Sequence, residues 1–131
     1  IINAMNFRQY NTKKEEELFD TIFHFTSVNN SYIVERQRKM SDVLENFTNT
    51  RKFDFGTKST FDFVLYNKTT KLPVLIIELN GHEHYTNAKR IELDELKKQI
   101  CRDNNIKLLT IENDYSRRYI FVRDQIIKLL V

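Results

Sequence analysis

Two carboxylates interrupt apolar stretches of the sequence. Asp62 lies within the run Phe61–Tyr66, and Glu78 directly follows the run Val74–Ile77. Both runs are predicted to be strands, and the short polar segment between them predicts an antiparallel hairpin. If the turn is centred near Thr70, Asp62 lies opposite Glu78 on the same face of the sheet. Two like charges repel there, but a divalent cation such as Mg²⁺ prefers such oxygens and removes the conflict.

Polar residues after Glu78 have spacings that suit the same site. Asn80 shares a face with Glu78 and would add a carbonyl oxygen to a metal or orient a water molecule. Gly81 allows a sharp turn, after which His84 can return towards the carboxylates. Either carboxylate taken alone is more simply a solvated strand end, whereas the whole group favours a metal site. His82 and His84 with a carboxylate form a weaker zinc alternative, because the expected Cys or third His does not accompany them.

The elements that position these residues follow from periodicity and capping signals. Thr12 and Glu15 form a capping box at the start of the first helix. In chain order we expect a helix over 13–25, a short strand at 32–34, strands at 61–66 and 74–79, a helix over 87–102, a strand at 107–111 and a helix over 119–130. Residues 40–47 fit either a helical turn or a loop. The helix over 87–102 predicts a parallel crossover, and therefore an α/β fold with a mixed central sheet flanked by helices.

The composition fits one domain. The 131 residues are 40% hydrophobic, so we expect a single domain over residues 5–131, with residues 1–4 as a cloning remnant before Met5. The formal net charge of +3 permits polyanion binding, but an ordinary solvated surface explains it equally well. The lone Cys101 is expected to be a buried, reduced thiol. We find no signal-peptide pattern or membrane-spanning apolar run, and expect a soluble, cytoplasmic protein.

The segment from Glu78 to His84, E-L-N-G-H-E-H, resembles the E-L-D-G-x-x-H segment of the PD-(D/E)XK nucleases. The similarity is to the branch like the very-short-patch-repair endonucleases. Further segments resemble other parts of that branch, namely Thr12–Glu15 its T-x-x-E, Asp62–Phe63 its D-F, Asp94–Lys97 its D-x-x-K/R helix, and Ile106–Leu109 its last core strand. The order and spacing of these motifs are more specific than any one of them.

The resemblance implies a restriction-endonuclease-like αβββαβ core and phosphodiester cleavage with Mg²⁺ or Mn²⁺. Asp62 and Glu78, with Asn80, would bind the metal. Glu15 would project from the first helix as a ligand through water or as an orienting group. His84 would position a phosphate or protonate the leaving oxygen.

The chain departs from the family pattern at one position. Asn80 stands where the branch has Asp and the wider superfamily has Lys. Lys97 would substitute for that lysine from its helix. A solvated Lys97, or a Lys97 paired with Asp94, is the simpler alternative from the sequence.

Together these features predict a metal-dependent endonuclease acting on nucleic acid, with DNA as the first expected substrate. Basic residues would hold the phosphate backbone, namely Arg36, Arg38, Lys97 and Lys98. A variant of this hypothesis is a secreted toxin domain neutralised by an inhibitor or immunity protein. The alternative from another class is a non-catalytic nucleic-acid or protein interaction module that retains the nuclease fold, and Asn80 favours it.

Overall fold

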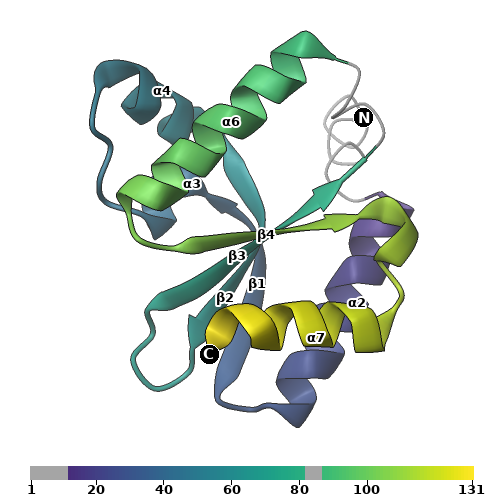
Figure 1. Ribbon diagram of the computed structural model, residues 1–131. Coiled ribbons are helices and arrows are strands. Elements are labelled where there is room, and N and C mark those ends of the chain that lie inside the picture. The colour runs from purple at the N-terminus through teal and green to yellow at the C-terminus, as the bar shows by residue number, and fades with distance from the viewer. Residues whose placement is uncertain (1–11, 82–86) are drawn as a thin grey trace, which may run out of the picture.

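The computed structural model describes residues 12–81 and 87–131. Its centre is a four-stranded sheet in the order β1-β2-β3-β4. The strands are β1 (Tyr32–Lys39), β2 (Thr60–Asn67), β3 (Pro73–Asn80) and β4 (Lys107–Glu112). The pairs β1–β2 and β2–β3 are antiparallel, whereas β3 and β4 run parallel. This confirms the predicted mixed sheet, with the hairpin at its centre and the crossover strand at one edge (Figure 1).

Helices cover both faces of the sheet (Figure 1). On one face lie α2 (Lys13–Val28) and α7 (Tyr119–Leu130), with the 3-10 turn η1 (Asn113–Tyr115) leading from β4 to α7. On the other face lie α3 (Met40–Val43), α4 (Thr50–Lys58) and α6 (Ala88–Asp103). The predicted α/β sandwich is therefore confirmed. Within the described ranges, no helix is both long and apolar enough to cross a membrane.

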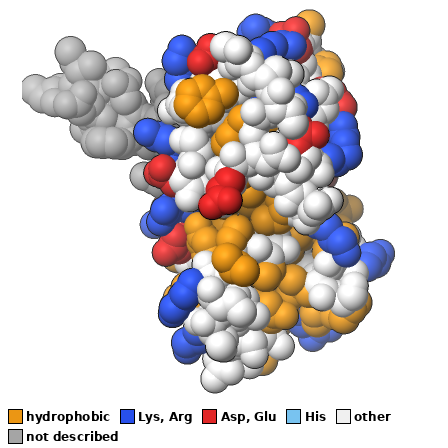
Figure 2. All heavy atoms as spheres, turned by 90° about the vertical axis from the view of Figure 1, so that its left-hand side faces the viewer, with side chains coloured by type: hydrophobic (Ala, Val, Ile, Leu, Met, Phe, Trp, Pro, Cys, Tyr) orange, Lys and Arg blue, Asp and Glu red, His pale blue; other side chains and the backbone are white. Residues whose placement is uncertain are grey.

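Two apolar clusters hold the layers together, one on each face of the sheet. The cluster under α2 and α7 consists of Leu18, Ile22, Phe25, Phe63, Leu65, Leu75, Ile77, Leu109, Ile111, Val122 and Ile126. The cluster under α6 consists of Met40, Leu44, Phe61, Val64, Ile76, Leu96, Ile100, Cys101 and Ile106. Apolar side chains still reach the surface between α4 and the β2–β3 turn (Figure 2), so the helices do not cover this second face completely.

Local signals explain where most helices begin. At α2 the predicted capping box is present, with Thr12 Oγ1 accepting from the Glu15 N–H at 3.2 Å. Asn87 caps α6 by accepting from two backbone N–H groups. Residues 40–47 contain the single helical turn α3. The sequence prediction missed α4, which Asn49 caps and whose only buried residue is Gly56. Its large apolar residues, Phe53 and Phe55, are two positions apart, a spacing that does not indicate a helix.

The register of the sheet places four residues in one row. The pairs Phe63–Ile77 and Val64–Ile76, when continued by one residue, put Asp62 opposite Glu78 as predicted. On the other side, the pairs that flank Gln37 put it opposite Asp62. In the parallel pair, Glu78 lies beside Thr110 of β4. The row Gln37–Asp62–Glu78–Thr110 therefore crosses all four strands at the end of the hairpin remote from its turn.

Candidate active site

The two carboxylates identified in the sequence are joined by reciprocal hydrogen bonds to the backbone. The Asp62 N–H donates to Glu78 Oε2 at 2.6 Å, and the Leu79 N–H donates to Asp62 Oδ2 at 2.9 Å. The regular β2–β3 ladder extends only to the pair Phe63–Ile77. Beyond this pair, each carboxylate accepts a hydrogen bond from the backbone of the opposite strand. These contacts bring the two acids together at the point where the strands separate.

Lys97 extends from α6 to this pair. Its Nζ lies 2.6 Å from Glu78 Oε1 and 3.1 Å from the carbonyl oxygen of Thr60. The side chains of Lys97 and Glu78 are each only 15% exposed. The simpler sequence interpretation of Lys97 as a solvated charge is therefore wrong, because the helix phase turns its ammonium group towards Glu78. The negative charge of Asp94 also acts on Lys97, with a smaller effect on its pKa than that of Glu78.

The charges at the site are not balanced. Burial lowers the pKa of Lys97, but the negative charge and hydrogen bond of Glu78, with further help from Asp62, raise it overall, so the ammonium form persists. Burial and the neighbouring Glu78 raise the pKa of Asp62 from 3.8 to about 8. One lysine therefore does not neutralise the acids, and Asp62 holds a proton near neutral pH in the absence of another cation.

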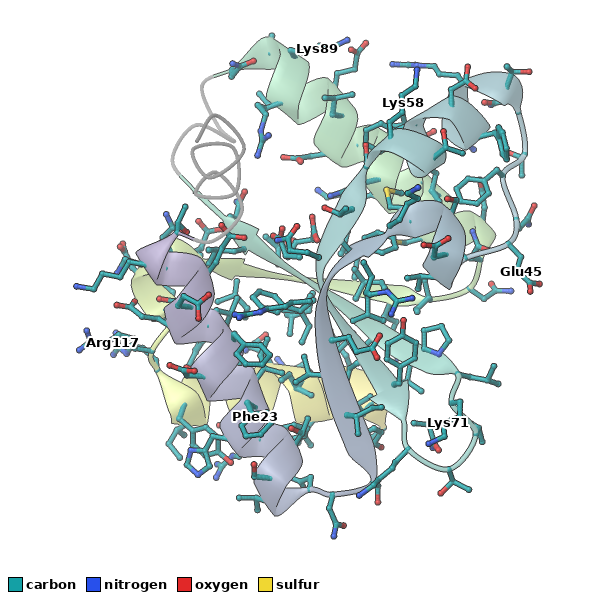
Figure 3. All side chains as sticks on the ribbon, turned by 180° about the vertical axis from the view of Figure 1, so that it is seen from behind. Phe23, Glu45, Lys58, Lys71, Lys89 and Arg117 are labelled. Carbon is teal, nitrogen blue, oxygen red and sulfur yellow. The ribbon has the colours of Figure 1, made fainter. Side chains whose placement is uncertain are left out.

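Glu15 is the acid of α2 that faces this site, as predicted. Its Oε2 accepts from Gln37 Nε2 at 2.9 Å, and burial together with the charges of Glu16 and Glu78 raises its pKa. Its neighbours point elsewhere, since Glu16 pairs with Arg36 at 2.9 Å and Glu17 accepts from a serine hydroxyl near α7. Figure 3 shows the polar side chains that gather between the N-terminal end of α2 and α6.

Asn80 lies beside the carboxylates but is held by a residue that the sequence analysis missed. Asn80 Nδ2 donates to Glu112 Oε2 at 3.0 Å. An acid at the end of a predicted strand gave no signal, because the parallel β3–β4 register was needed to place it next to Asn80. A cleft of about 300 Å³ opens beside Glu78 and Asn80, and its other lining residues are Leu79, Ile91, Asp94, Glu95, Lys97, Lys98, Leu108 and Thr110.

The donor set fits a hard divalent cation better than zinc. Asp62 and Glu78 supply carboxylate oxygens, Asn80 supplies an amide, and Mg²⁺ typically binds one or two carboxylates while keeping several waters. Within residues 12–81 and 87–131, no three His, Cys, Asp or Glu side chains are close enough to form a ready-made metal cluster. His84, and the zinc alternative with His82, lie outside the described residues.

The predicted phosphate-binding residues have different environments. Arg36 pairs with Glu16 and stacks over the Phe19 ring at 4.2 Å, whereas Arg38 pairs with Glu35 at 2.7 Å. Both ion pairs are on the surface, where such pairs contribute little to stability. Lys98 lines the cleft beside Glu78.

A family model described as "Protein of unknown function (DUF2726)" matches residues 8–129 of the chain. The chain belongs to the DUF2726 family. Every site residue described above falls within the region of the DUF2726 match. Searches of curated proteins and of solved structures found no match.

Proposed function

We propose that this DUF2726 domain is a metal-dependent nuclease of the PD-(D/E)XK type. The observation that carries the proposal is the convergence of Asp62, Glu78 and Lys97 at the separated ends of β2 and β3, with Lys97 Nζ 2.6 Å from Glu78 Oε1. Two acids and one lysine, partly buried beside an open cleft, match what phosphodiester hydrolysis needs. A purely structural role explains them poorly, because burial and Glu78 raise the pKa of Asp62 to about 8 and one lysine does not neutralise both acids.

The resemblance of the sequence motifs to PD-(D/E)XK nucleases supports the proposal. Apart from the short helices α3 and α4 between β1 and β2, the order α2, β1, β2, β3, α6, β4 is the αβββαβ order which that resemblance implies. Asn80 occupies the position at which the wider superfamily has lysine. The ammonium group of Lys97, which comes from α6 and reaches Glu78, supplies the missing positive charge.

Asp62 and Glu78 would hold Mg²⁺ or Mn²⁺, with the amide oxygen of Asn80 as a further donor. When bound, the cation supplies a Lewis acid and lowers the pKa of its water. Lys97 would stabilise negative charge on the attacking oxygen or on the phosphate, since its ammonium form is maintained. Glu15 would accept a hydrogen bond from water and orient it.

Nucleic acid is the substrate class that these charges favour, and DNA is the first to test. The chain carries a net charge of +3, and Lys98 stands on the cleft beside the acids. Contacts of this kind bind the phosphate backbone and carry no sequence information. We therefore propose that the described residues bind nucleic acid without recognising a particular base sequence.

The test is cleavage of plasmid DNA, single-stranded DNA and RNA with Mn²⁺, Mg²⁺ or EDTA. Wild type should cut at least one substrate with metal and none with EDTA. Glu78→Gln should lose this activity, because it weakens both the metal site and the Lys97 pair. Glu45→Gln is the matched control at an exposed acid remote from the site (Figure 3), and it should cut as wild type does. Nucleic-acid binding without cleavage would instead support an interaction module.

A further inference from the structure

Gln37 lies in β1, next to the acidic site, and no sequence motif pointed to it. The register places it directly opposite Asp62, and the β1–β2 ladder pairs its two neighbours but not Gln37 itself. Its side chain instead forms hydrogen bonds with one residue of α2 and one residue of β2. The β1 strand thus contributes one residue to the site, at the level of Asp62 and Glu78.

The amide of Gln37 connects α2 to β2. Its Nε2 donates to Glu15 Oε2 at 2.9 Å, and its Oε1 accepts from Thr60 Oγ1 at 3.0 Å. A primary amide can donate to a carboxylate and accept from a hydroxyl at the same time, which neither a carboxylate nor an apolar side chain can do. The backbone carbonyl of Thr60 in turn accepts from Lys97 at 3.1 Å. The amide of Gln37 therefore contacts Glu15 directly and is linked to Lys97 through Thr60.

The backbone of Gln37 is strained. Its φ of 54° lies in the left-handed region, which glycine and asparagine adopt far more readily than glutamine. The other described non-glycine residues with positive φ are Lys71, in the β2–β3 turn, and Asn105, just after α6, where tight turns require it. A strained backbone conformation persists only where the surrounding contacts enforce it, and such positions cluster at functional sites.

We propose that Gln37 is a positioning residue that holds Glu15 against the Asp62–Glu78 pair and steadies the Thr60 backbone that anchors Lys97. It touches neither metal nor substrate, and acts through Glu15 and Thr60. This inference rests on the proposed nuclease function for its kinetic test. Its structural part, the placement of Glu15, is tested separately below.

The first test separates the side chain from the backbone. Gln37→Gly keeps the left-handed conformation without strain but removes both contacts, so kcat should fall roughly 10–100-fold, the usual effect of losing a supporting hydrogen bond. KM for DNA should change little, and the melting temperature should stay near that of wild type. Lys71→Gly is the matched control, since it relieves a φ of 65° far from the site and should leave kcat unchanged. Full activity in Gln37→Gly would overturn the proposal.

The second test asks whether Gln37 acts through Glu15. In a double-mutant cycle, Gln37→Gly should lower kcat strongly in the wild-type background and only weakly in the Glu15→Gln background. Equal losses in both backgrounds would mean a general structural role and would reject the inference. Gln37→Glu, which places a second carboxylate against Glu15, should be at least as inactive as Gln37→Gly.

A measurement without catalysis distinguishes this inference from the proposed function. If wild type cuts no nucleic acid, the nuclease proposal fails, and the ¹³C carboxyl resonance of Glu15 then decides the role of Gln37. That resonance should move in Gln37→Gly and stay in place in Lys71→Gly. An unmoved Glu15 resonance in Gln37→Gly would show that Gln37 does not position it.

Discussion

Glu78 Oε2 accepts a hydrogen bond of 2.6 Å from the backbone N–H of Asp62, at the point where the paired part of β2 and β3 ends. The acid thus binds the partner strand as well as facing Lys97. Side chains at this site therefore contribute to the strand ends and to the proposed chemistry together. A variant that changes the charge of an acid but keeps its hydrogen bonds therefore distinguishes the contribution to stability from the contribution to the proposed chemistry.

Asp62→Asn should stabilise the metal-free protein while abolishing metal-dependent cleavage. Asparagine keeps an oxygen that can accept from the Leu79 N–H but carries no charge. In wild type, burial and Glu78 raise the folded pKa of Asp62 to about 8 from 3.8. The stability contributed by protonated Asp62 is therefore complete below 3.8 and is lost as the pH rises through about 8. The advantage of Asp62→Asn should grow over this window.

Urea unfolding with EDTA at several pH values measures this difference. The control is Asp20→Asn, at an exposed acid on α2, which should show no such growth with pH. A stability difference between Asp62→Asn and wild type that is the same at all pH values would contradict the raised pKa.

Lys97→Met should destabilise the fold and remove cleavage. It leaves Glu78 and Asp62 partly buried without their positive partner, and breaking a buried pair in this way costs about 3 kcal/mol. Lys89→Met is the control, because Lys89 is 72% exposed and pairs only at the surface (Figure 3), so its loss should change stability little. Chemical denaturation of both variants measures the contrast, and equal stabilities would mean that the Lys97 pair contributes nothing.

Asn80→Asp should tighten Mn²⁺ binding in calorimetry, because it restores the carboxylate that the resembling branch carries. The same change removes the amide that donates to Glu112 Oε2 and places a carboxylate next to it. Because the two carboxylates repel one another, the metal-free protein should become less stable. Adding Glu112→Gln should recover that stability without loosening the metal. If Asn80→Asp binds Mn²⁺ no better than wild type, position 80 does not contribute to the metal site.

Cys101 should react slowly with thiol reagents in the native protein and rapidly in urea. Its side chain is 1% exposed, and burial together with the negative charge of Glu78 raises its thiol pKa to about 12. Labelling with Ellman's reagent followed by absorbance provides the rate. Fast labelling of the native protein would show that α6 separates readily from the sheet.

The sequence was sufficient for the parts of the fold that local patterns determine. The capping box at Thr12, the hairpin and the final helix over 119–130 all lie where predicted, because capping and apolar periodicity are local properties. The position of Asp62 across from Glu78, one residue beyond the last ladder pair, also followed, since a short polar turn leaves few registers for two apolar strands.

Other parts of the site depend on contacts between distant segments. Gln37 and Glu112 were missed because their roles arise from neighbours on other strands, which no local pattern encodes. Lys97 was identified, but its burial depends on the angle at which α6 packs on the sheet. Helix α4 was missed because its single buried residue gives no periodic signal.

The seating of α6 also determines where that helix tolerates changes in length. Leu96 and Ile100 are buried in the core and fix its rotation about its own axis, and Lys97 lies between them. Each inserted residue turns the following helix by about 100°. An insertion between Lys97 and Ile100 would therefore aim the ammonium group away from Glu78 or pull Ile100 out of the core. An insertion before Leu96 would displace only the first turns of the helix, in which Leu93 and Asp94 are half-buried and the other residues are exposed. Natural length variation in this helix should therefore be confined to its N-terminal half.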